Sequence, residues 1–141
     1  FPTRRSSDLL QFVYKFKGAD KTALCTDAMR GAGMPDGESI LGSLTNGQKV
    51  IIEDGVAKLP DRSAFAGSVA TADRLVRTMI NIAGIPLIDA IRMITLTPAR
   101  ILHVDSQKGS LEEGKDADIV IFDNQINVTT TISKGHVIYN Q

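Results

Sequence analysis

Hydrophobic residues recur along the chain in two spacings, which predict helices in one part and strands in another. Over residues 72–83 they follow the i, i+3, i+4, i+7 rule, and Gly84 ends the pattern. A second helix is expected over residues 86–94, opened by its proline, and a short third helix over residues 97–102, with Thr97 as the N-cap. Three helices therefore follow one another in the middle of the chain.

Strand patterns flank this helical part on both sides. Residues 50–52 and 56–59 are apolar runs separated by Glu-Asp-Gly, and the Asp54-Gly55 pair is a strong hairpin signal. After residue 103 the period changes to two, and three further strands are expected at residues 117–122, 128–132 and 136–139. Three short strands with open edges are marginal alone, so we expect them to join a sheet begun elsewhere in a longer chain.

The beginning of the chain divides in two. Apolar residues over 9–16 have helical spacing, and Gly18 supplies a stop. Residues 1–8 show neither period, and we interpret them as a leader that is not native to the protein. The natural chain would then extend further upstream. The expected division is residues 1–8, then 9–102 with the helices, then 103–141 with the final strands.

The amino-acid composition argues against some classes of binding partner. The chain has 141 residues, 43% of them hydrophobic, and its 16 basic and 16 acidic residues give a formal net charge of zero. A sizeable core is possible, whereas neither nucleic acid nor a membrane is an expected partner, because there is no basic face and no long apolar run. The single cysteine, Cys25, suggests a reducing cytoplasmic location, and we expect its thiol to be packed in a strand.

Asp27 is the first candidate for chemistry. Residues 22–28 form a bounded apolar run that predicts a buried strand, and Asp27 lies where that strand would emerge. Barrels of alternating strands and helices place their catalytic groups at such strand ends. The residues that follow, 29–37, are rich in Gly and Pro and predict a loop over the site. The pattern alone also allows Asp27 simply to cap that loop.

Two other motifs are set aside. Residues 109–115 have the Gly-x4-Gly-Lys spacing of a phosphate-binding loop, but Asp116 replaces the required Ser or Thr and a strand pattern follows instead of a helix. A turn that leads into a strand is favoured. His103 and His136 lie in different elements without a metal-binding spacing. A metal site built wholly within this chain is not expected.

Several segments together resemble the amidohydrolase superfamily, and within it the branch that deacetylates phosphorylated amino sugars. They are Leu-Cys-Thr-Asp-Ala at 24–28, Phe-Ala-Gly-Ser at 65–68, Thr-Pro-Ala-Arg at 97–100, Gly-Ser-Leu-Glu-Glu-Gly-Lys-Asp-Ala-Asp-Ile-Val at 109–120, and Ser-Lys-Gly-His-Val-Ile-Tyr at 133–139. The 109–120 and 133–139 segments are general to the superfamily. The first two segments are more specific to the deacetylase branch.

The resemblance implies an α/β fold, a metal-dependent hydrolase (β/α)8 barrel with a small β-sandwich. A complete barrel needs about 250 residues, so this chain would hold only the last barrel strand, the trailing helices and the C-terminal strands of the sandwich. In the family, the metal-binding Glu and two His come from earlier strands. A divalent metal ion, zinc or similar, is therefore implied for the whole enzyme, with its ligands absent here.

The resemblance also assigns roles to residues. Asp27 matches the catalytic aspartate, and Phe65, Ala66 and Gly67 match a bend that contacts substrate. The implied reaction converts N-acetylglucosamine 6-phosphate to glucosamine 6-phosphate and acetate in a homo-oligomeric enzyme. Two alternatives stay open: another amidohydrolase, such as a dihydroorotase, hydantoinase or acyl-amino-acid deacylase, and a non-catalytic domain that stands alone.

Overall fold

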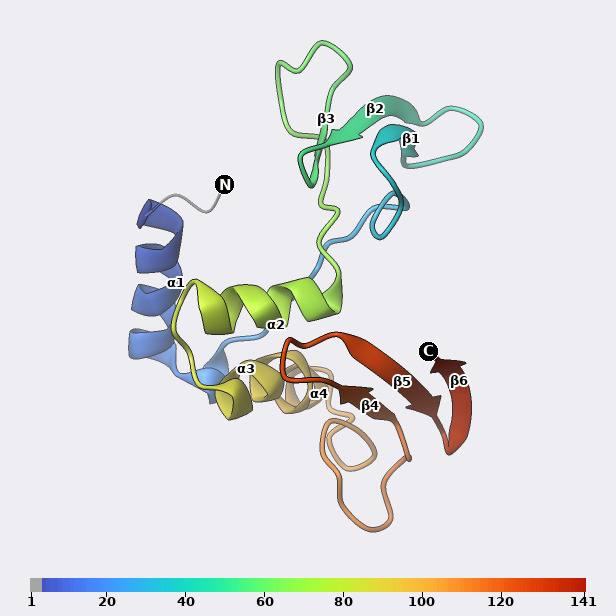
Figure 1. The fold of residues 1–141 in the computed structure, drawn as a ribbon. Coiled ribbons are helices and arrows are strands. Elements are labelled where there is room, and N and C mark those ends of the chain that lie inside the picture. Colours follow the sequence, from blue (N-terminus) through green and yellow to red (C-terminus); the bar gives the residue numbers. More distant parts are fainter. Residues whose placement is uncertain (1–3) are drawn as a thin grey trace. The chain divides into compact units, whose positions relative to one another are not determined.

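A computed structural model of the chain describes residues 4–141, with the side chains of residues 4–6 left aside. Its ordered elements fall into two units, residues 25–75 and the remainder, which are described separately. The chain begins with helix α1 (Arg4–Lys17) and a single 3-10 turn, η1 (Ala19–Lys21) (Figure 1). The expected helix is thus present but starts within the supposed leader. Residues 1–3 of that leader lie outside the described part.

The unit of residues 25–75 is built on a small antiparallel sheet. Its strands are β1 (Gly37–Leu41), β2 (Gln48–Glu53) and β3 (Val56–Lys58), in the order β1-β2-β3 (Figure 1). The hairpin predicted from Asp54-Gly55 is confirmed. Both turn residues have positive φ, 55° and 71°, as the tight turn that matches strand twist requires. Strand β1 was not predicted, because its first half is polar and opens on glycine.

One face of this sheet carries the unit's core. The buried side chains are Met29, Val50, Ile52, Ala57 and Ala66, with Leu41, Leu59 and Val69 packed against them. Val50 and Ile52 are 1% and 4% exposed and lie two residues apart, so they share one face of β2. The loop after Asp27 and the bend at residue 66 are therefore held by the same apolar cluster.

The other unit is centred on the three predicted helices. They are α2 (Ala72–Asn81), α3 (Leu87–Ile94) and α4 (Leu96–Ile101). Pro86 lies at the N-cap of α3, where its missing N–H has no helical partner to lose. The role predicted for Thr97 is wrong. Thr97 lies inside α4 and is 1% exposed, and its hydroxyl donates to the Ala19 carbonyl at 2.7 Å.

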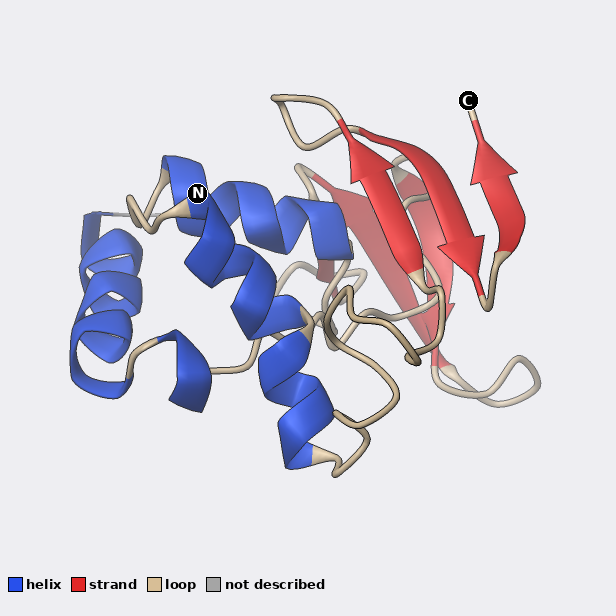
Figure 2. Cartoon of the chain, turned by 90° about the horizontal axis from the view of Figure 1, so that it is seen from below, coloured by secondary structure: helices blue, strands red, loops and turns tan. Residues whose placement is uncertain are grey.

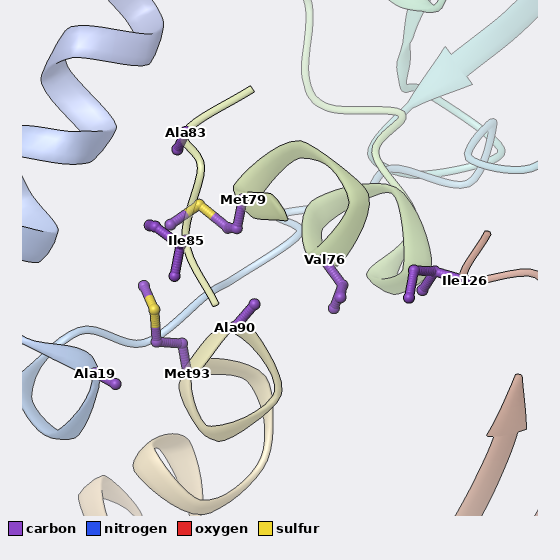
Figure 3. Close-up of a cluster of buried hydrophobic side chains, with 8 residues drawn as sticks. All are labelled: Ala19, Val76, Met79, Ala83, Ile85, Ala90, Met93 and Ile126. Atoms are coloured by element: carbon purple, nitrogen blue, oxygen red, sulfur yellow. The ribbon is translucent and has the colours of Figure 1, made fainter. Parts of the chain in front are cut away.

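Small and flexible apolar side chains fill the core of this unit. They are Ala19, Val76, Met79, Ala83, Ile85, Ala90, Met93 and Ile126. Figure 3 shows Met79, Ile85 and Met93 directed toward one another between α2 and α3. Ala90 and Met93 are completely buried, so they form the face that α3 contributes to this core. Helix α1 joins through the Tyr14 hydroxyl, which donates to the Asp89 carboxylate at 2.5 Å.

The three C-terminal strands are confirmed. Strands β4 (Ile119–Phe122), β5 (Val128–Ser133) and β6 (His136–Asn140) form an antiparallel sheet in the order β4-β5-β6, and the C-terminus follows β6 (Figure 2). Every residue of β6 is exposed. Within the described residues, the outer edges of β4 and β6 pair with no further strand. Over the same residues, no helix combines the length and the apolar character needed to cross a membrane.

Candidate active site around Asp27

The segment that carries Asp27 is extended but is not the buried strand predicted from its sequence. The Leu24 N–H donates to the Met93 carbonyl at 2.8 Å, and Ala28 makes an isolated parallel bridge to Ser68. Among the described residues no continuous ladder runs along residues 22–28. The prediction of a packed Cys25 is also wrong, since its side chain is exposed. A central strand is buried only when neighbouring strands cover it, and among the described residues the Ala28–Ser68 bridge is the one strand-like pairing of this segment.

Asp27 has an unusual backbone conformation. Its φ is 46°, in the left-handed region that few residues other than glycine adopt. Aspartate tolerates this conformation better than most side chains. Such residues concentrate at active sites, where the surrounding structure holds them. Here the exposed Asp27 carboxylate is presented between an extended segment and the bridge made by Ala28.

The bend at residues 65–67 is anchored on β3. Phe65 pairs with Lys58 in an antiparallel bridge, and the Ala66 N–H donates to the Ala57 carbonyl at 2.9 Å. Ala66 is buried at 6% exposure, whereas the Phe65 ring is 77% exposed. Gly67 has a φ of 93°, and a Cβ there would lie 3.2 Å from Leu41 Cδ1. The positive φ therefore favours glycine, and a Cβ would fit only if the flexible Leu41 side chain moved by a few tenths of an ångström.

The structure brings Asp27 and this bend together. Ser68 directly follows Gly67, and its carbonyl accepts the Met29 N–H at 2.8 Å beside the Ala28–Ser68 bridge. Two segments that are distant in the sequence thus run in parallel at the point where Asp27 is presented. The residues assigned to catalysis and to substrate contact form one continuous patch of backbone within one unit.

Three charged residues form a group at the β2–β3 hairpin and the loop that follows it, and no sequence pattern predicted their pairing. Glu53 accepts two hydrogen bonds from Arg62, at 2.9 and 3.1 Å, and one from Lys58 at 3.0 Å. These bonds, first from Arg62 and then from Lys58, lower the pKa of the Glu53 carboxyl from 4.5 to about 2. The only available signal was their proximity to a hairpin, because the pairing depends on strand register and on the fold of the following loop.

The described residues do not supply a metal site. No group of three or more His, Cys, Asp or Glu side chains among residues 4–141 could hold a metal ion. His103 lies after α4 and His136 at the start of β6, and Asp27 belongs to the other unit. The residues present therefore do not fit a complete metal centre.

The rejected phosphate loop is a turn, as predicted. The Lys115 ammonium donates to the Ser110 hydroxyl at 2.6 Å and to the Glu112 carboxylate at 3.3 Å within the same loop. Strand β4 follows, not a helix, so this loop does not lead into the helix N-terminus on which a phosphate-binding loop depends. Its lysine is engaged by its own loop.

Comparison with known proteins points to one kind of chemistry. Residues 19–138 match the amidohydrolase family. The chain is 40% identical over 128 residues to the N-acetylglucosamine-6-phosphate deacetylase of Lysinibacillus sphaericus, and 39% identical over 118 residues to a putative N-acetylgalactosamine-6-phosphate deacetylase of Escherichia coli K12. It superimposes on the crystal structure of the Pasteurella multocida N-acetylglucosamine-6-phosphate deacetylase with a TM-score of 0.84 and 30% identity.

These matches cover most of this chain but a smaller share of its relatives. They include 91% of the chain for the L. sphaericus protein, 84% for the E. coli protein and 95% for the P. multocida structure. In the opposite direction the chain spans 32%, 68% and 34% of those proteins, respectively. The chain thus corresponds to about a third of two of these deacetylases.

Proposed function

This chain belongs to the amidohydrolase family, and from that premise we propose that it is the C-terminal part of an enzyme that deacetylates N-acetylglucosamine 6-phosphate. The observation that carries the proposal is the parallel bridge between Ala28 and Ser68. It joins a carboxylate in a strained conformation to a bend that leaves Phe65 exposed. A proton-transfer group next to a ligand-facing surface is what amide hydrolysis needs.

In the proposed reaction, Asp27 moves one proton. Water attacks the acetamido carbonyl carbon, the carbon–nitrogen bond breaks, and acetate and the free amine are released. A carboxylate within hydrogen-bond reach can accept a proton from the attacking water and return it to the departing amine. The exposed position of Asp27 in this chain leaves its carboxylate accessible for that role.

The bend at residues 65–67 is proposed to contact the substrate. The Phe65 ring offers an exposed apolar surface on which a sugar ring or an acetyl methyl group can pack. Gly67 allows close approach of the backbone, because it carries no side chain. The bend would orient the substrate relative to Asp27, which is where enzymes gain rate through positioning.

The proposal also covers features of the whole enzyme that the residues of this chain do not provide. A divalent metal ion, held by residues outside the chain, would lower the pKa of the attacking water. The phosphate contacts, a cytoplasmic location and a homo-oligomeric assembly belong to the whole enzyme as well. The phosphorylated amino sugar is the one ligand proposed.

A second candidate substrate differs from the first in the configuration of the sugar. Identity to the relative named for N-acetylgalactosamine 6-phosphate is 39%, against 40% for the one named for N-acetylglucosamine 6-phosphate. The two sugars differ only at one hydroxyl. The galactosamine substrate is therefore the alternative to test beside the first.

A chimera tests the proposal directly. Residues 9–141 replace the matching third of the L. sphaericus deacetylase, which supplies the rest of the enzyme. We expect the chimera to release acetate from N-acetylglucosamine 6-phosphate, and Asp27→Asn to lower kcat by about 10²–10⁴-fold, the usual contribution of a general acid–base group.

The matched control is Glu113→Gln, which neutralises an exposed carboxylate in the turn before β4, outside the loop that follows Asp27. Its activity should stay within about twofold of the parent chimera, since an exposed surface change has little effect. Metal content and circular dichroism should be unchanged in both variants. A correctly folded Asp27→Asn chimera with full turnover overturns the role of Asp27. Preference for the galactosamine substrate selects the second candidate.

A further inference from the structure

Glu53, Lys58 and Arg62 form an ordered charged group at the β2–β3 hairpin and the loop that follows it. The Glu53 and Lys58 side chains are 26% and 21% exposed, so both are largely covered, while Arg62 is 58% exposed. Arg62 uses two nitrogen atoms on the two oxygens of Glu53, a bidentate geometry that fixes both side chains. Most exposed ion pairs contribute little, and a bidentate pair joined to a second cation is the exception.

Arg62 lies in the loop that connects β3 to the bend at residues 65–67. That loop closes on itself through two backbone bonds, Leu59 N–H to the Ala64 carbonyl at 2.9 Å and Arg62 N–H to the Leu59 carbonyl at 2.8 Å. Arg62 itself has a φ of 60°, which is unfavourable for a side chain of this length. Its bonds to Glu53 therefore help to hold a loop conformation that the backbone alone does not favour.

The loop leads straight into the candidate site. Phe65 returns to pair with Lys58, the second cation on Glu53, so one residue both contacts the carboxylate and aligns the bend. Two residues after the alignment at Ala66, the Ser68 backbone bridges to Ala28 beside Asp27. A continuous line of backbone contacts thus runs from the charged group to the proposed catalytic carboxylate.

We infer that Glu53, Lys58 and Arg62 are positioning residues, which fix the Phe65–Gly67 bend beside Asp27 and so control substrate binding. The inference rests on the proposed function for its consequence, but the positioning itself can be measured separately. None of the three residues moves a proton in the proposed reaction. Their loss should therefore weaken binding more than it slows the chemical step.

The kinetic test uses the chimera with Arg62→Gln, Glu53→Gln and the double variant. Each single change should raise KM about tenfold and leave kcat within about threefold, since a displaced binding element affects the ground state and the transition state alike. The double variant should match Glu53→Gln, because Arg62 has no carboxylate to pair with once Glu53 is replaced, while Arg62→Gln alone keeps the Lys58–Glu53 bond. Arg62→Lys should recover only part of the affinity, since lysine cannot make the bidentate contact.

The matched control is Arg100→Gln. Arg100 makes an exposed pair with Asp20 at 3.3 Å in the other unit, so the change removes a similar ion pair without touching the hairpin. Its KM and kcat should equal those of the parent. If Arg62→Gln behaves like Arg100→Gln, the positioning role is overturned.

A second measurement keeps the inference separate from the proposed function. Hydrogen exchange of the full 141-residue chain follows the Leu59 and Ala66 amides, whose acceptors lie within this unit. Arg62→Gln should speed their exchange about tenfold and leave the amides of α2 and α3 unchanged, because local opening is confined to the hairpin. An inactive parent chimera contradicts the deacetylase proposal alone. Unchanged exchange at Leu59 and Ala66 contradicts the positioning role, whatever the activity.

Discussion

At the scale of single residues, two of the six described non-glycine residues with positive φ lie at or beside the proposed site. Asp27 and Arg62 have φ values of 46° and 60°, and each lies beside the bend at residues 65–67 or its connecting loop. Neither side chain is one that a turn demands, unlike glycine. Their conformations are imposed by the contacts around them, which links both residues to the site more firmly than their chemical type does.

The titration of Glu53 provides a test at this scale. Its pKa is lowered to about 2 by Arg62 and Lys58. A carboxyl with a lowered pKa in the folded state contributes stability above its unfolded pKa, 4.5, and loses that contribution as the pH falls through about 2. The Glu53 ion pair should accordingly protect the Ala66 amide from hydrogen exchange from neutral pH down to about 4.5. Below that pH the protection should weaken as Glu53 is protonated.

NMR observation of the Glu53 carboxyl carbon checks this directly in the 141-residue chain. We expect a midpoint near 2, and a clear upward shift in the Arg62→Gln variant, which removes the largest cause of the lowered pKa. If the Glu53 titration midpoint of Arg62→Gln equals that of the parent chain, the result contradicts the ion pair between Arg62 and Glu53.

At the scale of elements, sequence patterns predicted correctly those helices and turns whose conformation depends on their own residues. The β2–β3 hairpin followed from Asp54-Gly55, because those two residues adopt positive φ within the turn itself. Helix α2 followed from its apolar stripe. The segment at residues 22–28 failed as a strand, because a strand needs a neighbour and the sequence of the segment does not say which neighbour is present. Cys25 is exposed for the same reason.

Helix α3 offers a matched test of which face carries stability. Met93 is fully buried and Ile88 is 73% exposed on the same helix. Met93→Ala should lower the free energy of unfolding by about 2–5 kcal/mol, since it leaves a cavity between α2 and α3. Ile88→Ala should change it by less than about 0.5 kcal/mol. Urea denaturation followed by circular dichroism measures both, and equal effects contradict the packing of this helix.

At the scale of the whole molecule, large apolar side chains remain exposed on several elements. They include Ile101, Leu102, Leu111, Val137 and Ile138, each more than 60% exposed. Exposed apolar surfaces of this kind are typical of interaction sites. The chain also spans only about a third of the L. sphaericus relative, so we propose that the remaining part of the enzyme covers these residues.

Two outcomes are expected for the 141-residue chain alone. It should be catalytically silent with added zinc, since the residues described here supply no ligand set, and it should self-associate through its exposed apolar residues. Size-exclusion chromatography and an acetate-release assay measure the two properties. Co-expression with the part of the L. sphaericus deacetylase that this chain does not match should reduce the association. Deacetylation by the monomeric chain contradicts this view of the molecule.

Periodicity and turn residues predicted helices α2 and α3 and the β2–β3 hairpin, and the sequence motifs indicated the amidohydrolase family. The family match and the P. multocida structure confirm that resemblance. These features depend on residues close together in the chain, so periodicity and turn chemistry report them. Three features could be seen only in the folded chain: Asp27 adjoins the bend at residues 65–67, Thr97 is buried inside α4, and Arg62 binds Glu53. Each of these three features depends on contacts between segments that are distant in the chain. A local sequence pattern does not predict such contacts.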